Sequence, residues 1–489
     1  MLKKLLSLLS DAAIYGVSSV MSQLMSFLLL PLFMQPGRLT KADFGILGLL
    51  FVVNTLFMGV AGLGIPNALF RRFNAEKTPE KKGEVLSTTL LSAVLSGLAF
   101  LAICWVAARP IAEHVVGSPK TVHLVELTLL AGALGLVNNV VLGTQKAARR
   151  VKTVAALTLW KLAVYFSTSI FFVIYLEMGV LGAVYGTLAA EVLLAVVQTA
   201  VTARSFMFWP TWSTWKQLAS YGIPLIPHIV QSIGLILFGQ YVVGHQLGLS
   251  EAGLYNVAMK FATPAAFIIG SIQSSWAAYK YQVHEEDPDA RSFYRSLMTY
   301  YVAATCYLWV GVSVWGPEVL RAISPDIYHA AALLIPAASF VYIAQGVYFM
   351  LGTGIDLSDN TRAFPIVSFL GLITVVGGTF LTVNRFGSAA AFTVTGIGWI
   401  VMAAAVYYFA QKRLSIRYDW KSLFPLWGSA VAAVVVILIF QSQPLPTRLA
   451  LAALLTIGYP LLLLTVLLRS PHERARVWFI LRKVPLVTR

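Results

Sequence analysis

Apolar residues dominate fourteen stretches of the chain, each about 20 residues long, the length an α-helix needs to cross a hydrocarbon core about 30 Å thick. The gaps between them are short, so little of the 489-residue chain remains for a soluble domain. The pattern therefore predicts an all-α polytopic membrane protein with 14 transmembrane helices. The predicted spans are 11–34, 44–65, 85–107, 122–143, 154–176, 180–201, 221–243, 252–278, 297–317, 329–351, 364–383, 389–409, 423–440 and 449–468.

Basic residues fall in alternate gaps between these spans. With the N-terminus in the cytoplasm, 27 of the 36 Lys and Arg residues lie in cytoplasmic segments and 7 in the opposite loops. This asymmetry follows the positive-inside rule and predicts that both termini are cytoplasmic. The net charge of +16 then reflects topology and contact with anionic membrane lipids, and we expect no nucleic-acid partner.

The two remaining basic residues, Lys161 and Lys260, lie inside predicted spans, and so does Glu191. An ionisable side chain in the hydrocarbon costs several kcal/mol unless it pairs, faces water or reaches the headgroups. Both lysines lie close enough to a span end for the side chain to extend to the headgroups. Glu191 lies near the centre of its span, so we expect it to be protonated or paired, with Lys161 on the preceding span as the nearest partner.

These three residues lead the candidate functional residues, with Glu191 in ion coupling and the lysines in binding substrate. Neutral polar residues in the spans add hydrogen-bonding capacity, although an isolated histidine in a span is more often structural. Two arginines just after the second span have the guanidinium geometry that matches phosphate, although they could equally anchor the cytoplasmic face. These further candidates are Arg71, Arg72, His228, Gln231, Asn54 and Asn67.

A weak internal repeat relates the two halves of the chain. Tyr15-Gly16 in the first span recurs 206 residues later as Tyr221-Gly222, and Asp43-Phe44-Gly45-Ile46 corresponds to Glu251-Ala252-Gly253-Leu254 at an offset of 208. Six spans separate the copies, so both copies cross the membrane in the same direction. This predicts a parallel repeat about an axis along the membrane normal, one of the arrangements used by transporters.

The repeat predicts two lobes of six helices related by a pseudo-twofold axis, followed by a terminal helix pair. The predicted boundaries are an N-lobe at 1–205, a linker at 206–220, a C-lobe at 221–415, and a last helix pair with a basic tail at 416–489. Trp209, Trp212 and Trp215 in the linker suit the headgroup level of a membrane. Pro224, Pro227 and Pro264 concentrate helix breaks in the seventh and eighth spans and indicate a bending element.

Enzyme signatures are missing from the sequence. No outer loop carries a convincing pair of carboxylates, and no GxxxxGK[ST] motif for nucleotide phosphates is present. Cys104 and Cys306 lie within spans, so we expect no disulfide framework. We expect a non-enzymatic transporter with no catalytic residue, cofactor or metal site, driven by an H⁺ or Na⁺ gradient, the membrane potential or the substrate gradient.

Three strings of residues resemble the polysaccharide-export (Wzx-type) flippases of the multidrug/oligosaccharidyl-lipid/polysaccharide (MOP) superfamily. They are Ile14-Tyr15-Gly16 with Asp43-Phe44-Gly45-Ile46, Leu63-Gly64-Ile65 continuing to Arg71-Arg72-Phe73, and Tyr221-Gly222-Ile223-Pro224 continuing to Gly253–Phe261. Each string is short, but together they occur in the family's order and spacing. One departure is Gly239-Gln240, where many relatives carry an Asp-Arg pair.

This resemblance implies a flippase in the bacterial cytoplasmic (inner) membrane. It would move a polyprenyl-(pyro)phosphate-linked oligosaccharide to the outer leaflet by alternating access, with Lys260 at the family's basic position. Implied partners are the lipid-linked saccharide, membrane lipids, and a polysaccharide polymerase or glycosyltransferases; the transport unit would be a monomer.

Several alternatives stay open at this level. A lipid II flippase usually carries arginines in the first helix, which this chain lacks, and a drug/cation antiporter would have twelve helices and an acidic N-lobe site. A membrane polymerase would need catalytic acids in a long outer loop, whereas an accessory scaffold leaves no signature to test.

Overall fold

The computed structural model describes residues 27–148, 150–202, 209–286, 288–358 and 363–467. Within these ranges the regular structure is entirely helical, and 13 helices are long and apolar enough to cross a membrane. They coincide with the second to fourteenth predicted spans, which confirms the fold class. Most of the first predicted span, 11–34, lies outside the described residues, so the count of fourteen and the side of the termini stay predictions.

The chain divides into two compact units. The first contains the chain up to Asn256 together with Phe380–Ser388, and the second contains Val257–Thr379 and the chain from Ala389 onward. The lobe boundaries predicted from the repeat stay a prediction. The helices of the first unit are α2 (Leu30–Phe33), α3 (Lys41–Ala61), α4 (Ile65–Ala75), α5 (Pro79–Val106), α6 (Ala108–Ile111), α7 (Val122–Ala147), α8 (Val151–Ile170), α9 (Gly179–Thr202), α10 (Trp212–Gly222) and α11 (Ile226–Gln246).

Helix α12 (Leu249–Glu286) begins in the first unit and continues into the second. Both α12 and the helix that follows it extend well beyond the spans predicted from hydropathy, because the helix continues through polar residues past the apolar segment. The other helices that lie wholly or mostly in the second unit are α13 (Ala290–Ile323), α14 (Ile335–Leu351), α15 (Thr353–Asp356), α16 (Ala363–Phe386), α17 (Ser388–Gln411), α18 (Trp420–Phe440) and α19 (Leu445–Leu467).

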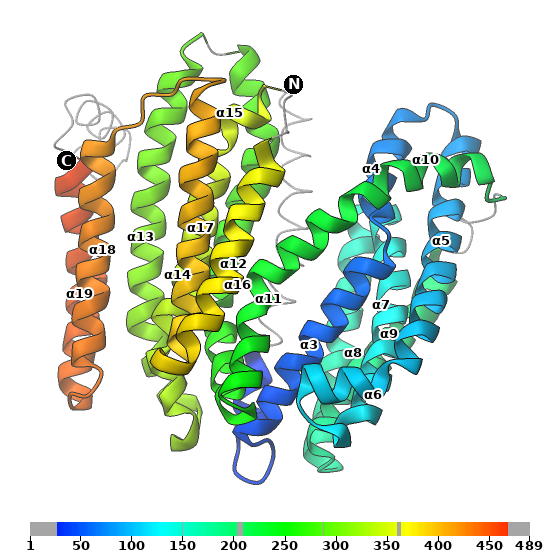
Figure 1. Cartoon of the computed structure of the whole chain (residues 1–489), viewed down its shortest axis with the longest axis horizontal. Coiled ribbons are helices and arrows are strands. Elements are labelled where there is room, and N and C mark those ends of the chain that lie inside the picture. The colour runs from blue at the N-terminus through cyan, green and yellow to red at the C-terminus, as the bar shows by residue number, and fades with distance from the viewer. Residues whose placement is uncertain (1–26, 149, 203–208, 287, 359–362, 468–489) are drawn as a thin grey trace, which may run out of the picture. The chain divides into compact units, whose positions relative to one another are not determined.

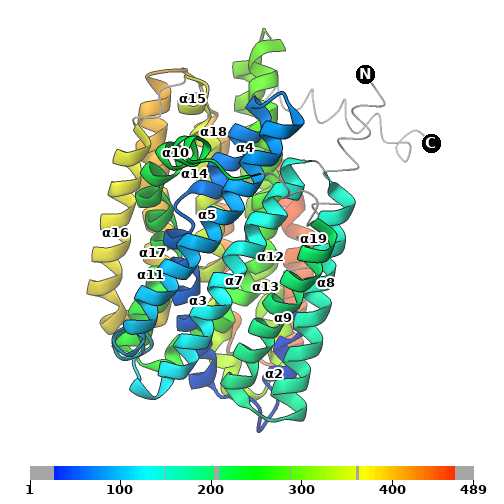
Figure 2. The ribbon, with the colours of Figure 1, turned by 90° about the vertical axis from the view of Figure 1, so that its right-hand side faces the viewer.

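In the first unit, α7, α8 and α9 lie side by side, and the short helices α4 and α10 contact each other (Figures 1 and 2). Helix α10 is tied to α5 by Glu84, whose carboxylate accepts hydrogen bonds from the hydroxyls of Thr211 and Thr214. Trp212, on α10, is 73% exposed and stacks on Trp215 with ring centroids 4.4 Å apart. Two of the three linker tryptophans therefore stack on one face of α10, and Trp209 lies before the helix.

The repeated glycines meet in a reciprocal contact between α3 and the first turns of α12. A Cβ on Gly45 would lie 2.0 Å from the carbonyl oxygen of Leu249, and a Cβ on Gly253 would lie 1.8 Å from that of Lys41. Lys41 and Leu249 are themselves 208 residues apart, like the two glycines. The contact is thus self-complementary, as expected where a twofold axis passes between two copies of one motif.

A second backbone contact joins the other resemblance strings. The chain leaves α3 through Leu63 and Gly64, which have φ values of +49° and +65°. A Cβ on Gly64 would lie 2.1 Å from the carbonyl oxygen of Gly222, at the end of α10. Glycine is required at position 64 by both its positive φ and this close approach. The glycine-containing strings of the sequence are therefore packing sites where backbones touch.

Proline residues lie where α10 ends and α11 begins. Residues Ile223–Leu225 form a 3-10 turn around Pro224, and α11 starts with Pro227 in its first turn. Proline lacks an N–H donor and is tolerated there because the first N–H groups of a helix have no intrahelical acceptor. Pro264 lies inside α12.

Candidate functional site

The two charged residues predicted to pair within the first unit form an ion pair. Lys161 on α8 places its Nζ 2.6 Å from Glu191 Oε1 on α9. The Lys161 side chain is 32% exposed and that of Glu191 is 10% exposed. The predicted partner of Glu191 is therefore confirmed, and the amino group of Lys161 lies on the carboxylate instead of extending to the headgroups.

Both residues lie far from the ends of their helices. At a rise of 1.5 Å per residue, Lys161 is about 15 Å from the start of α8 and Glu191 about 18 Å from the start of α9. A charge at such a depth is stable only with a partner or with access to water. The pair supplies the partner, and the Lys161 side chain stays partly exposed.

A third helix completes the cluster. Asn138 on α7 donates from Nδ2 to Glu191 Oε2 at 2.8 Å and to the Glu191 carbonyl oxygen at 2.9 Å. Gln198 lies about two turns after Glu191 on the same face of α9 and donates to the Asn138 carbonyl oxygen at 3.3 Å. Gly135 leaves room for the carboxylate, because a Cβ there would lie 3.3 Å from Glu191 Oε1. The carboxylate is thus held by one cation and one amide between three membrane helices.

Lys260 lies on α12 in the second unit and is half-buried. Lys161, the other intramembrane lysine, lies in the first unit. Each lysine is a separate candidate in its own unit.

The remaining candidates are scattered. Arg72 forms an ion pair with Glu76, the residue that follows α4, at 2.7 Å. Asn54 faces Gly132, and its buried Oδ1 has no hydrogen-bond partner among the described residues. Gln231 is half-buried on α11. Three predicted candidates have side chains outside the described part of the structure: Arg71, Asn67 and His228.

Gln240 occupies the position where the resemblance expects an arginine. It is 1% exposed and donates from Nε2 to the Ala252 carbonyl oxygen at 2.9 Å. Gly48 leaves space for this amide, because a Cβ there would lie 2.5 Å from Gln240 Nε2. The neutral side chain therefore connects α11 to the start of α12.

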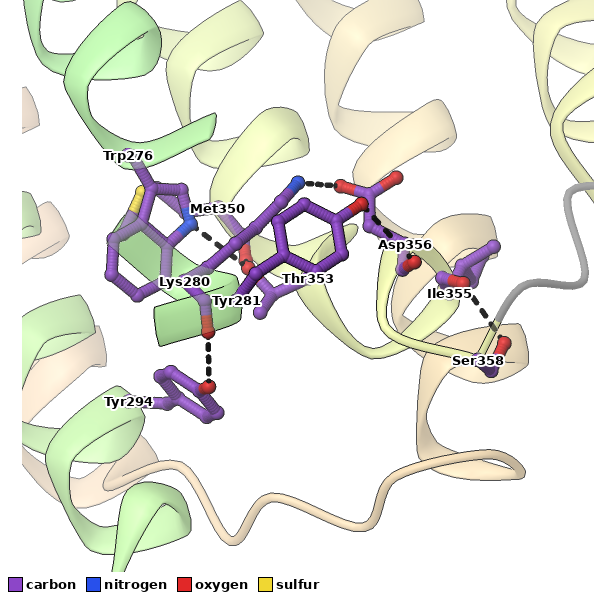
Figure 3. A network of polar contacts seen from close by, with 9 residues as sticks. All are labelled: Trp276, Lys280, Tyr281, Tyr294, Met350, Thr353, Ile355, Asp356 and Ser358. Carbon is purple, nitrogen blue, oxygen red and sulfur yellow. Dashed lines mark hydrogen bonds and ion pairs between the residues drawn. The ribbon is translucent and has the colours of Figure 1, made fainter. Parts of the chain in front are cut away.

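Sequence analysis missed a charged network in the second unit (Figure 3). The ammonium of Lys280 pairs with the Asp356 carboxylate and lies 5.3 Å from the centre of the Tyr281 ring. The Tyr281 hydroxyl donates to the Asp356 carbonyl oxygen, and Trp276 donates to the hydroxyl of Thr353. Lys280 is only 8% exposed. Its burial could not be foreseen, because hydropathy places it outside the spans.

Removing the acid from this network is expected to destabilise the protein. Asp356→Asn leaves the buried Lys280 ammonium without its anion and should lower the free energy of unfolding by about 1.5–3 kcal/mol. The measurement is the melting temperature of the purified protein in detergent. The matched control is Asp326→Asn, since the Asp326 side chain is 100% exposed and faces His329 three residues further along. Equal melting temperatures for the two variants would contradict a stabilising role for Lys280–Asp356.

Comparison with known proteins places the chain in a family. The family model described as polysaccharide biosynthesis protein matches residues 38–332. No curated protein matches the chain in sequence. Among solved structures, the lipid II flippase MurJ in an inward closed conformation has a TM-score of 0.70 at 13% identity, covering 94% of this chain and 99% of that one.

Two transporters of the MOP superfamily are also similar in structure. An inward-facing multidrug resistance MATE family transporter has a TM-score of 0.67 at 15% identity, covering 80% of this chain and 94% of that one. A MOP superfamily transporter from Pyrococcus furiosus has a TM-score of 0.61 at 14% identity, covering 82% and 95%. Since these identities are low, the likeness shows the fold alone. The chain therefore belongs to the polysaccharide biosynthesis protein family and has the fold of the MOP superfamily transporters.

Proposed function

We propose that the protein is a flippase that carries a polyprenyl-(pyro)phosphate-linked oligosaccharide from the inner to the outer leaflet of the bacterial inner membrane. The observation that supports this most is the Lys161–Glu191 pair, a partly exposed cation held deep between membrane helices by a buried carboxylate. The fold is that of drug and lipid transporters, and the family is one of polysaccharide biosynthesis. A transporter of a phosphate-linked saccharide needs a cation that can bind the phosphate of its substrate.

The pair suggests how binding and coupling could be linked. While Glu191 is ionised, its carboxylate competes with any phosphate for the Lys161 ammonium. Protonation of Glu191, or a sodium ion beside it, removes this competition and leaves Lys161 to the phosphate. Asn138 keeps the acid in place in either state, because its amide also donates to the Glu191 carbonyl oxygen. Transport then needs an H⁺ or Na⁺ gradient and no cofactor.

The remaining parts of the proposed site serve the same cargo. In the second unit, Lys260 is the candidate cation for the phosphate, while Gln231 and Asn54 of the first unit offer hydrogen bonds to sugar hydroxyls. The Gly45–Gly253 contact lies at the outer end of α3 and α12 on the topology that the charges predict. Its opening and closing would be one step of alternating access. A polymerase or glycosyltransferases would act before or after transport as partners.

A lipid II flippase is the second candidate, because the likeness to MurJ covers 94% of this chain. Both candidates predict a phosphate-bearing lipid, and they differ in the saccharide. The arginines usual in the first helix of lipid II flippases are missing here, which favours the oligosaccharide.

Reconstitution into vesicles tests the proposal. A polyprenyl-pyrophosphate-linked oligosaccharide is placed in the inner leaflet, and its arrival outside is followed with an impermeant glycosidase. We expect transport by the wild type and a loss of about tenfold or more in Lys260→Ala, since one charge-assisted phosphate contact contributes at least about 1.5 kcal/mol. The control is Lys152→Ala, an exposed lysine of α8. Movement of lipid II alone would select the second candidate, and movement of neither lipid would reject a flippase.

A further inference from the structure

Two arginines from distant parts of the chain meet on one acid in the second unit. Arg321, in the last turn of α13, places Nη1 2.7 Å from Glu318 Oε1, and Arg448, in the first turn of α19, places Nε 3.1 Å from the same oxygen. The Gln441 side chain, at the end of α18, accepts from Arg321. Three helices therefore contribute to one cluster of two cations and one anion.

The cluster keeps a net charge of +1 although its members are mostly buried. The side chains of Arg321, Arg448 and Glu318 are 16%, 18% and 11% exposed. A partly buried cation without a full counter-charge is costly, so a second anion would stabilise this arrangement. Elsewhere on the predicted outer side, Arg38 and Arg109 each pair with an acid of their own, Glu177 and Glu113.

A polar atom and a pocket indicate where such an anion would lie. The Nε of Arg448 is buried and lacks a hydrogen-bond partner among the described residues, because its approach to Glu318 does not have hydrogen-bond geometry. Arg448, Glu318 and Gln441 line a small pocket, open to the surface, with a cavity volume of about 20 Å³, room for about one water molecule or one phosphate oxygen. The remaining lining is apolar and includes Val314, Ile437, Phe440 and Leu451.

The surroundings select a lipid phosphate as the anion. Apolar side chains of α18 and α19 are widely exposed along the helices that leave the cluster: Ile439 is 64%, Leu454 67% and Ile457 71% exposed. Such surfaces suit acyl or polyprenyl chains, whereas two guanidinium groups match phosphate oxygens. Since the cluster lies at the predicted outer end of these helices, its ligand would come from the outer leaflet.

We infer that Arg321 and Arg448 form a binding site for the phosphate group of an outer-leaflet lipid, with Glu318 as an internal competitor. Two sources share this chemistry: an anionic phospholipid of the membrane, or the polyprenyl phosphate part of a transported lipid. The second source rests on the proposed function, whereas the first does not.

Binding to purified protein tests the inference, and transport need not be measured. The probes are phosphatidylglycerol, a polyprenyl phosphate and, as a lipid without net charge, phosphatidylcholine, each titrated in detergent and followed by native mass spectrometry. Arg448→Gln should weaken binding of the anionic probe about tenfold, as expected for one charge-assisted contact. Glu318→Gln should strengthen it several-fold, because the competing carboxylate is gone, and misfolding cannot produce such a gain. The control is Arg109→Gln, an exposed arginine that pairs with Glu113.

Each outcome decides the inference. Preference for phosphatidylglycerol assigns the site to membrane phospholipid, and preference for polyprenyl phosphate assigns it to the transported lipid. If Glu318→Gln binds the anionic probes no better than wild type, and Arg448→Gln binds them equally well, the cluster only fastens α18 and α19 to α13 and the inference is wrong. If the variants change lipid binding as expected but the wild type transports no lipid in vesicles, the proposed flippase function is wrong and the phosphate site is still supported.

Discussion

Lys161→Met is expected to abolish most transport and to lower the stability of the protein. The substitution leaves the Glu191 carboxylate, 10% exposed, with Asn138 as its remaining side-chain partner among the described residues. Removing one member of a buried ion pair costs about 3–5 kcal/mol, because the other charge is left uncompensated. Transport should fall about tenfold or more, which corresponds to the loss of at least about 1.4 kcal/mol of interaction with the substrate phosphate. The measurements are vesicle transport and the melting temperature in detergent.

A double variant separates the structural role from transport. Lys161→Met/Glu191→Gln removes both charges and conserves volume, so the melting temperature should return close to that of the wild type. Transport should stay lost, since neither the cation nor the titratable acid is present. Lys152→Ala, on the exposed side of the same helix, should change neither property. If the double variant transported normally, Lys161 and Glu191 would be a structural pair and the proposed coupling would fall.

Gly45→Ala and Gly253→Ala are expected to separate α3 from the first turns of α12. The added Cβ atoms would lie 2.0 Å and 1.8 Å from backbone carbonyl oxygens, which cannot move as a flexible side chain can. Overpacking of this kind costs about 1–3 kcal/mol. If the contact belongs to one state of a two-state transporter, that state should lose population about 5- to 150-fold. Transport should decline because the contact no longer closes.

Chemical labelling detects this separation directly. Ala252 is fully buried beside the contact, so Ala252→Cys, in a chain without Cys104 and Cys306, should react slowly with an impermeant maleimide. Adding Gly45→Ala should accelerate the reaction from the outer side. Gly311→Ala is the matched control, because a Cβ on that glycine of α13 meets nothing within 4 Å. Unchanged labelling in the Gly45 variant would mean that the helices tolerate the Cβ and that the contact does not control access.

The positions of the membrane helices were predictable because each span must be continuous, long and apolar on its own. Hydropathy could not predict the helical extensions at the end of α12 and the start of α13, since these segments are polar and are stabilised by tertiary contacts such as Tyr294 to the Lys280 carbonyl oxygen. The Lys161–Glu191 pair was predictable because adjacent spans joined by a short connection pack together. Asn138 was not, because it lies 53 residues before Glu191 and is one of many neutral polar residues in the spans.

The sequence by itself determined the membrane class, the spans, the charge asymmetry and the repeated glycines, because these depend on local composition and on spacing along the chain. Only the tertiary structure decided which glycines touch, that Lys280 is buried against Asp356, and that Arg321 and Arg448 share Glu318. Arg321 and Arg448 are 127 residues apart and each resembles an ordinary loop charge. Their partners depend on which helix ends meet, and this follows from the packing of whole helices and cannot be inferred from any short segment.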